Sequence, residues 1–233
     1  MVGSLNVLFL ATVVFVGGHF LLSSMPVRKV LIRRIGETPF RILYAIIAGG
    51  SFVWMLFAYG AAPYAEVWSP PPVFHWLPAV LMPIAIFLAV AGITTQGATA
   101  VGGERVLTDE VHDLSPGILR VTRHPFLWGA ALWAIAHLAV NGDAASVVLM
   151  AGILLLSIGG MLHIDSRREA TMEAAWGPFA MTTSLLPFAA ILSGRTRFDW
   201  PGIGLWRVAL ALVLYAALLH FHEWIVGVSA LPA

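Results

Sequence analysis

Long apolar runs separated by shorter polar segments dominate this chain. Each run is close to the roughly 20 residues that a helix needs to cross a bilayer. The runs cover residues 5–25, 39–60, 77–95, 125–140, 144–164 and 204–228. They are too long and too unbroken for barrel strands, and a lipid-exposed backbone must satisfy its own hydrogen bonds. The pattern therefore predicts an all-α fold, a polytopic integral membrane helical bundle of about six transmembrane helices.

The connections between the runs differ in character. Residues 61–76 are rich in proline and tryptophan, which predicts an ordered, extended loop at the membrane interface. The connection 96–122 is the most polar stretch. The turn sequence at 141–143 predicts that its two flanking runs pack as an antiparallel hairpin. The apolar segment 184–192 is too short to span, so we expect it to lie on the surface or to re-enter the membrane.

Composition supports a single membrane domain over residues 1–233. Hydrophobic residues make up 59% of the chain and charged residues 11%, whereas soluble domains carry about 25% charged residues. The chain contains no cysteine, which excludes disulfides, thiolate metal ligands and a cysteine nucleophile.

The placement of lysine and arginine predicts the topology. Residues 28–41 hold five of them, 96–123 hold three and 165–207 hold five, which accounts for all thirteen. The alternate loops and the C-terminus hold none. By the positive-inside rule the basic segments are cytoplasmic. We therefore expect a multi-pass protein of the bacterial inner (cytoplasmic) membrane with both termini periplasmic.

Histidines inside the apolar runs are the main indication of chemistry. His19, His137 and His220 are of this kind, and an intramembrane ionisable group usually faces the bundle interior or a cavity. Each could be a neutral imidazole bonded to a neighbouring helix, or an axial ligand of haem iron or another metal. By depth, His137 and His220 both lie roughly 24 Å from the cytoplasmic side and His19 about 10 Å. Depth alone favours a His137–His220 pair, and a His19–His137 pair needs tilted helices or a haem plane lying across the bilayer.

A polar set on the cytoplasmic side forms a second candidate site. Arginines can clamp carboxylates or phosphates, including haem propionates. The alternative is that these residues serve topology and form salt bridges to Asp113, Asp165 and Glu169. Trp133 could wall a cofactor pocket or be an ordinary packing residue. The cytoplasmic candidates are Arg120, Arg123, His124, Arg167 and Arg168.

Several segments together resemble one known family. They are GHFLLSS before an arginine cluster, TRHPFLWGAALWAIAHLAVNGD, DSRR and SLLPFAAILSGR. On these residues the chain resembles the NnrU family, which includes the 15-cis-zeta-carotene isomerases and proteins encoded near denitrification genes. The resemblance covers nearly the whole chain.

The resemblance implies a cofactor and its ligands. In the isomerases a haem b is held by one histidine in the first span and another in the span after the RHP sequence. These positions correspond to His19 and His137. The isomerases also carry a cysteine, proposed as an alternate ligand, three residues before the second histidine. This chain has Ala134 there, so the resemblance implies haem binding more directly than isomerisation.

A second likeness is to membrane methyltransferases of the isoprenylcysteine type. They share a GxxRxxRHPxxxG pattern, which this chain matches from Gly117 to Gly129. In those enzymes a pair of glutamates follows the later helix, and here the corresponding stretch is Arg167-Arg168-Glu169. We take this second likeness as shared architecture.

These observations predict an NnrU-like haem b protein linked to nitric oxide and denitrification metabolism. The first alternative is a haem-dependent cis/trans isomerase of a carotenoid, and the second is an isoprenylcysteine-type methyltransferase. Whether the protein is catalytic stays open. The expected partners are membrane lipid and a hydrophobic polyene or nitric oxide as ligand, with no nucleic acid.

Overall fold

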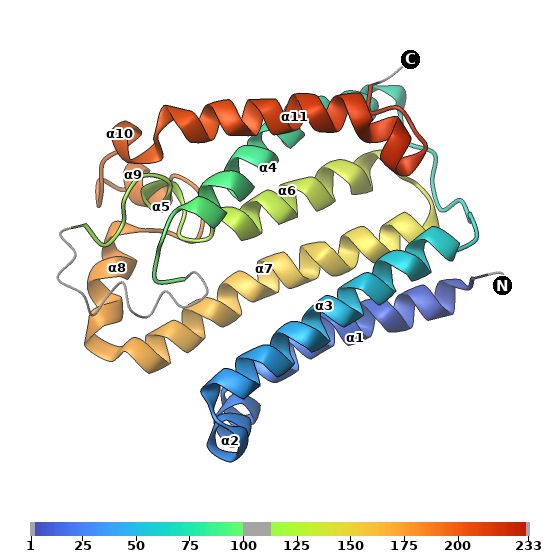
Figure 1. The fold of residues 1–233 in the computed structure, drawn as a ribbon. Helices are drawn as coiled ribbons and strands as arrows, with labels where there is room; N and C mark the ends of the chain where they lie inside the picture. Colours follow the sequence, from blue (N-terminus) through green and yellow to red (C-terminus); the bar gives the residue numbers. More distant parts are fainter. Residues whose placement is uncertain (1–2, 100–112, 232–233) are drawn as a thin grey trace.

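The computed structural model describes residues 3–99 and 113–231, and these residues form a bundle of helices (Figure 1). Within these ranges no β-strand is present, apart from one isolated bridge between Glu66 and Asp143. The predicted all-α class is confirmed. The middle of the polar connection expected over 96–122 lies outside the described residues.

Five helices in the described ranges are long and apolar enough to cross a membrane. They are α1 (Leu5–Ser23), α3 (Glu37–Ala61), α4 (Leu77–Thr94) with the preceding 3₁₀ turn η1 (Pro72–Trp76), α7 (Ala144–Met172) and α11 (Leu205–Val226). The sixth predicted span is the shorter apolar helix α6 (Pro125–Val140), which rises about 24 Å over its length. Pro125 stands in its first turn, where a missing N–H costs nothing. The chain is a polytopic helical membrane protein.

Shorter helices gather at one end of the bundle. The basic segment after the first span, which the pattern left as a connection, is the helix α2 (Met25–Ile35). The others are α5 (Ile118–Val121), η3 (Glu173–Ala175), α8 (Trp176–Thr182), α9 (Ala189–Leu192) and α10 (Trp200–Ile203). Figure 1 shows α2, α5, α8, α9 and α10 at the end away from the two marked termini.

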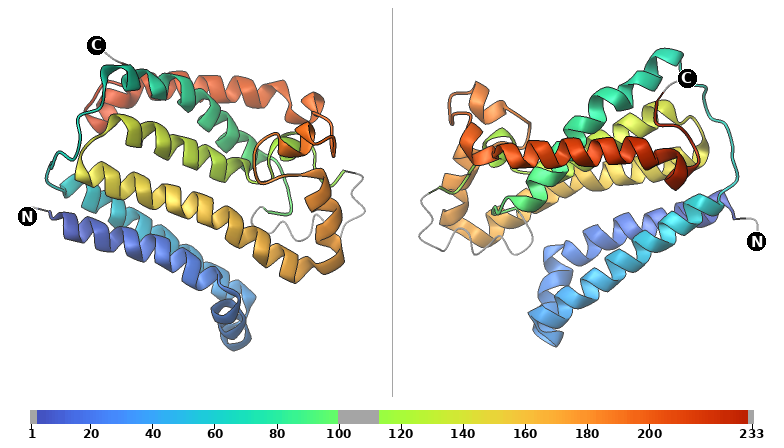
Figure 2. Two further views of the ribbon diagram at one scale, coloured as in Figure 1. Left: turned by 180° about the vertical axis from the view of Figure 1, so that it is seen from behind. Right: turned by 45° about the horizontal axis from the view of Figure 1, so that its top comes forward.

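The long helices pack in a single curved row. Helix α3 packs on α1, α1 on α7, α7 on α6, α6 on α4, and α4 on α11 (Figures 1 and 2). The α1–α7 seam is close: a Cβ added at Gly152 would overlap the side chain of Thr12. The main core cluster of the bundle includes Leu8, Phe15 and Leu149 at this seam. The row leaves α3 at one end and α11 at the other.

The predicted hairpin between α6 and α7 is confirmed, and the proline-rich loop is tied to it. Asp143 Oδ1 accepts the N–H of Ser146 at 2.9 Å, which caps the start of α7. The carbonyl of Gly142 accepts the N–H groups of Val67 and Trp68 at 2.8 and 3.1 Å. A Cβ at Gly142 would overlap the Trp68 carbonyl oxygen, so this close approach requires glycine.

The apolar segment 184–192 does not span the bundle. The carbonyl of Leu185 accepts hydrogen bonds from Thr122 Oγ1 at 2.9 Å and Trp128 Nε1 at 2.8 Å. The N–H of Phe188 donates to the carbonyl of Val121 at 2.8 Å. These bonds hold the segment against the start of α6, in agreement with the prediction of a segment that does not cross the membrane.

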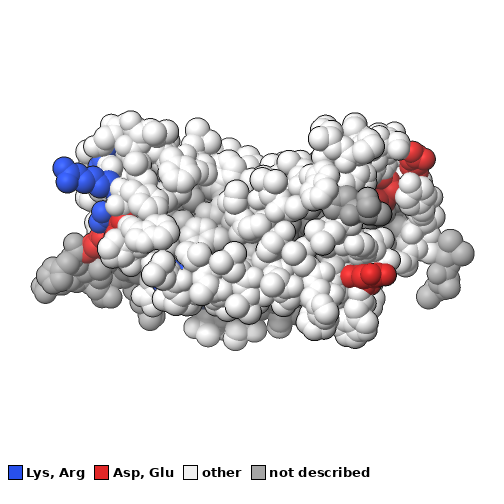
Figure 3. Space-filling model, turned by 90° about the horizontal axis from the view of Figure 1, so that it is seen from above, with Lys and Arg blue, Asp and Glu red and all other residues white. Residues whose placement is uncertain are grey.

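Charge is distributed unevenly along the bundle. In the view of Figure 3 the lysines and arginines gather at one end, and the middle is a broad uncharged band. Acidic residues lie at the opposite end and beside the basic ones. Both described chain ends lie away from the basic end (Figure 1). The arrangement agrees with the predicted segregation, while the side of the membrane stays a prediction.

Candidate functional site

A cleft of about 980 Å³ lies among α1, α3, α4, α6 and α7. This volume is at the upper end of the range of about 300–1,000 Å³ typical of ligand pockets. Its apolar part is lined by Phe15, Phe52, Leu56, Met82, Trp133 and Leu149, among others. Its polar part lies towards the basic end and is lined by Ser23, Arg28, Glu37, Arg41, His163, Arg167 and Arg168.

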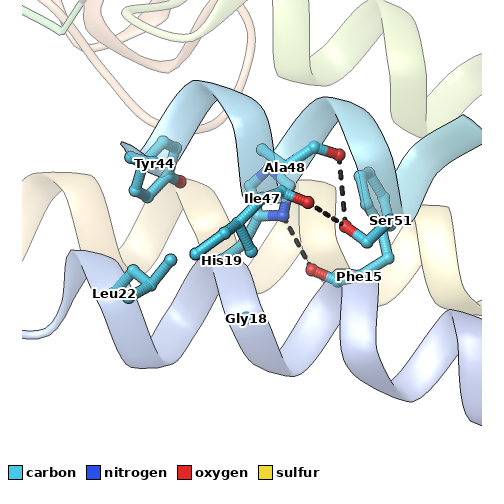
Figure 4. A pocket seen from close by; sticks show the side chains of 8 residues that line it. All are labelled: Phe15, Gly18, His19, Leu22, Tyr44, Ile47, Ala48 and Ser51. Atoms are coloured by element: carbon cyan, nitrogen blue, oxygen red, sulfur yellow. Dashed lines mark hydrogen bonds between the residues drawn. The ribbon is translucent and has the colours of Figure 1, made fainter. Parts of the chain in front are cut away.

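His19 lines this cleft and lies between two aromatic rings, and Figure 4 shows it in a small adjoining pocket between α1 and α3. Its Nδ1 lies 2.7 Å from the carbonyl oxygen of Phe15, one turn earlier in α1. Because a carbonyl only accepts, Nδ1 carries the proton and Nε2 keeps its lone pair. The imidazole packs edge-on against Phe15 at 4.6 Å and Tyr44 at 5.6 Å. Metal-binding histidines are oriented by this kind of second hydrogen bond.

His137 repeats the same arrangement on α6. Its Nδ1 lies 2.8 Å from the carbonyl oxygen of Trp133, again one turn earlier, and its ring lies 5.0 Å from the indole. Nε2 is again the nitrogen that can bind a metal. Trp133 lines the cleft, whereas His137 stands one turn beyond it and is not among the lining residues.

The two histidines stand at different levels of the bundle. Close approaches place Phe20 of α1 level with Gly159 of α7, and Leu127 of α6 level with Gly160. Counting along α7 from these two contacts, the levels of His19 and His137 differ by eight or nine residues, which is about 13 Å along the helix axes. A flat group held between them would turn its two faces towards the two ends of the bundle. The His19–His137 ligand pair stays a prediction.

Two further histidines differ in their access to the cleft. His220 is exposed on α11, with its ring 4.7 Å from Phe221, and the structure does not bring it to the cleft. His163 of α7 does line the cleft. Its Nε2 is buried and has no hydrogen-bond partner among the described residues, and its ring lies edge-on to Phe20 at 6.0 Å.

The residues of the RHP motif form ion pairs outside the cleft. Arg120 binds Asp113 at 2.7 Å. Arg123 lies 3.3 Å from Asp165 and 5.5 Å above the ring of Trp176. Burial lowers the pKa of Arg123, and the Asp165 carboxylate opposes this shift in part.

His124 shares the same carboxylate as Arg123. Its Nε2 donates to Asp165 Oδ1 at 2.7 Å, and its side chain is 2% exposed. The motif residues Arg120, Arg123 and His124 therefore hold the basic end together through ion pairs, which is the alternative that the sequence left open. Arg167 and Arg168, in contrast, line the cleft.

Sequence reasoning overlooked the contribution of α3 to the cleft. Its lining residues include Glu37, Arg41, Tyr44, Ala48 and Phe52. They recur every three or four residues, so they form one stripe along the helix. This spacing was the available signal. The stripe begins with polar residues and continues with aromatic and apolar ones. It therefore predicts a helix face that is polar at one end and apolar at the other.

Small residues on α6 bring helices together as well as leaving space. A Cβ at Gly129 would lie 2.6 Å from the carbonyl oxygen of Ala85, so this glycine permits the close packing of α4 and α6. Gly129 and Ala130 also line the cleft. Ala134 is fully buried in the main core cluster and does not line the cleft.

Comparison with known proteins identifies the family. A family model described as NnrU protein matches residues 7–230. The chain belongs to the NnrU family. The resemblance drawn from the motifs around His19 and the RHP sequence is thereby confirmed.

This NnrU-family chain is also similar to two curated plant proteins. It is 32% identical over 88 residues to a chloroplastic 15-cis-zeta-carotene isomerase of Zea mays, covering 38% of this chain and 24% of the relative. It is 26% identical over 166 residues to the chloroplastic 15-cis-zeta-carotene isomerase of Arabidopsis thaliana, covering 69% of this chain and 44% of the relative. The matches thus span less than half the length of these relatives. No solved structure matches the chain.

Proposed function

We propose that this NnrU-family protein binds haem b within the membrane and acts in nitric oxide or denitrification metabolism. The carrying observation is the matched anchoring of two intramembrane imidazoles. His19 and His137 each donate from Nδ1 to the carbonyl four residues earlier, at 2.7 and 2.8 Å. Each thereby presents Nε2, the nitrogen required of an axial ligand.

The residues around His19 suit a haem. The cleft has the volume of a ligand pocket and mostly apolar walls, and its basic end supplies guanidinium groups for propionates. His19, in the wall of the cleft, and His137, one turn beyond the lining residue Trp133, would hold the iron. Haem, when bound, would supply an iron that can exchange electrons and take up nitric oxide once a coordination position is vacated.

A haem-dependent carotenoid isomerase is the second candidate. Similarity to the two plant zeta-carotene isomerases favours it, and the apolar length of the cleft suits a polyene. Ala134 weighs against a mechanism that needs a thiolate, because it stands where those enzymes carry cysteine and it is packed in the core. A methyltransferase role is not proposed, because Arg120, Arg123 and His124 are engaged with Asp113 and Asp165.

The bacterial cytoplasmic membrane is the proposed location, with both termini periplasmic. The support is the bias of all thirteen lysines and arginines to three segments. Those segments meet at one end of the bundle in the described residues, opposite to the described chain ends (Figures 1 and 3).

Optical spectroscopy tests haem binding. Protein purified from haem-replete cells should show a Soret band and a b-type pyridine haemochrome. His19→Ala and His137→Ala should each lose or shift the band, because each removes an axial ligand. His220→Ala is the matched control, since His220 is exposed and lies outside the cleft. Absence of haem after supplementation, or a shift in His220→Ala alone, would reject the proposed ligands.

A paired assay separates the two candidate functions. One sample of reduced, haem-loaded protein is titrated with nitric oxide, and a second receives 9,15,9′-tri-cis-zeta-carotene with products separated by chromatography. We expect nitric oxide binding with little or no isomerisation. Turnover that disappears in His19→Ala or His137→Ala would make the protein an isomerase instead.

A further inference from the structure

The short helix α2 carries a dense cluster of positive charge beside the membrane. A single residue separates it from α1 on one side and from α3 on the other, so both of its ends are tied to membrane-crossing helices. Four of the thirteen lysines and arginines lie in its 11 residues, and no acidic residue does. They are Arg28, Lys29, Arg33 and Arg34. The helix therefore lies at the membrane interface, at the basic end of the bundle (Figure 1).

One of these four cations is turned towards the bundle, and the other three are not. The guanidinium group of Arg28 lies 3.6 Å from the carboxylate of Glu37 and 5.1 Å above the ring of Phe40. Lys29, Arg33 and Arg34 are exposed. Within residues 3–99 and 113–231, no ion pair or hydrogen bond of these three side chains is present. Their charges are therefore available to an anion outside the described fold.

Other arginines at the basic end are bound by the fold. Arg120 binds the Asp113 carboxylate at 2.7 Å, and Arg207 Nη1 donates to the carbonyl oxygen of Ile203 at 2.7 Å. Arg195 Nη1 lies 3.0–3.1 Å from three backbone carbonyl oxygens and donates to them. The positive-inside rule explains why lysines and arginines gather at one end. It does not explain why the three outer cations of α2 have no such partner, and a ligand of opposite charge does.

The three outer cations lie on one side of α2. Lys29 and Arg33 are four residues apart and share a helix face, and Arg34 stands next to Arg33. Val30 lies among them and is 47% exposed. Leu31, on the opposite face, is half-buried. A basic face with exposed apolar side chains is typical of a helix that lies in the plane of the membrane interface.

We propose that the exposed face of α2 binds the phosphate groups of anionic phospholipids in the leaflet at the basic end. A guanidinium group can bind phosphate oxygens bidentately, and the ammonium group of Lys29 adds a point charge. Clusters of about four to eight basic residues directly beside a span are typical of anionic-lipid recognition. The phosphate layer of the bilayer lies beside the end of every span, so phospholipid is the anion nearest to α2. This proposal does not rest on haem binding.

Fluorescence quenching by selected lipids tests the proposal. The chain contains no cysteine, so Val30→Cys provides a single site for a bimane label among the three cations. The labelled full chain is placed in phosphatidylcholine nanodiscs that also contain a nitroxide-labelled phospholipid, either phosphatidylglycerol or phosphatidylcholine. Quenching of the bimane at increasing nitroxide content gives the relative binding constant of the anionic lipid at α2. It should exceed that of the zwitterionic lipid by at least about fivefold, the effect of one basic residue near the surface.

Changes at single arginines locate the effect. Arg33→Gln removes one exposed cation and should lower the preference for phosphatidylglycerol by about fivefold, whereas Arg33→Lys should keep most of it. Arg197→Gln is the matched control, because Arg197 is also exposed at the basic end but lies outside α2. It should leave the preference unchanged. In about 1 M salt, where the Debye length is about 3 Å, the preference of the natural chain should shrink.

Three results would overturn the proposal. One is equal quenching by the two nitroxide lipids. Another is an equal loss of preference in Arg33→Gln and Arg197→Gln, because net charge and not the face of α2 would then select the lipid. The third is removal of the preference by added glycerol 3-phosphate, a soluble phosphate ester without acyl chains. That result would make α2 a site for a free phosphate ester and not for the lipid surface.

Discussion

The Asp165 carboxylate should contribute strongly to the stability of the basic end. Its two oxygens interact with two groups at once: one lies 3.3 Å from the Arg123 guanidinium group, and the other accepts a hydrogen bond from His124 at 2.7 Å. The exposed fractions of the three side chains are 20% for Asp165, 12% for Arg123 and 2% for His124. Asp165→Asn keeps the size of the side chain, removes the charge and leaves two largely buried donors facing a neutral amide.

The structure allows the magnitude to be worked out. Exposed ion pairs contribute about 0–1 kcal/mol, whereas breaking a buried pair by removing one partner costs about 3–5 kcal/mol. The low exposure of His124 and Arg123 places this cluster near the buried limit, and the remaining amide oxygen retains part of the hydrogen bonding. We therefore expect a loss of about 3 kcal/mol. At about 2–4 °C per kcal/mol for a chain of this size, the melting temperature should fall by about 6–12 °C.

The assay is thermal unfolding in detergent, followed by circular dichroism at pH 7. Asp113→Asn is the matched control, because Asp113 binds Arg120 at 2.7 Å but the two side chains are 41% and 26% exposed. It should cost about 1 kcal/mol or less. Equal shifts in the two variants would refute the reasoning, because burial would then not decide the contribution of these ion pairs.

Three other predictions follow from separate features. Ser69→Cys and Glu169→Cys, placed singly in the cysteine-free chain, should react with an impermeant maleimide from opposite sides of the membrane, and labelling of both in sealed cells would contradict the six-span topology. Gly142→Val should lower the melting temperature by several degrees, because its side chain would collide with the Trp68 carbonyl, whereas Gly177→Ala, with open space around it, should not. The pKa of Asp199 is lowered, first by the N–H of Gly117 at 2.7 Å. Its stabilising contribution is therefore present above the unfolded pKa of about 3.9 and is lost as the pH falls through the lower folded value. Between pH 6 and pH 3 the melting temperature should fall less steeply for Asp199→Asn than for the natural chain. Identical pH profiles of the melting temperature would argue against that assignment.

The sequence was sufficient for the spans and the hairpin because both depend on local signals. Apolar length marks the helices, and the turn at 141–143 marks the reversal between α6 and α7. The helix α2 was missed because its charges outweighed its apolar positions in a reading based on hydropathy. His19 was found because an imidazole in an apolar run is conspicuous, and its place in the cleft agrees with that reading.

The function of other polar residues depended on partners that are distant in the chain. Arg123 and Asp165 are far apart in the sequence, so the same arginine reads equally well as an anion clamp or as half of a salt bridge until the fold joins them. His163 stood at the end of an apolar run and gave no local sign that its Nε2 would be buried in a cleft. The α3 stripe was visible as a spacing, but only the packing of α3 on α1 turns it towards the cleft.

Because the helices pack in a single curved row, the width of the cleft depends on one helix contact, that between α1 and α7. Helices α1 and α3 form a pair that contacts the remaining helices chiefly where α1 meets α7. Along that seam a Cβ added at Gly152 would overlap the methyl group of Thr12, and one added at Gly159 would lie 2.8 Å from the tip of the Phe20 ring. A methyl group at Gly152 should therefore push α1, with α3 packed on it, away from α7 and change the width of the cleft between them. Gly152, which does not itself line the cleft, thus helps to set how wide a molecule the cleft admits.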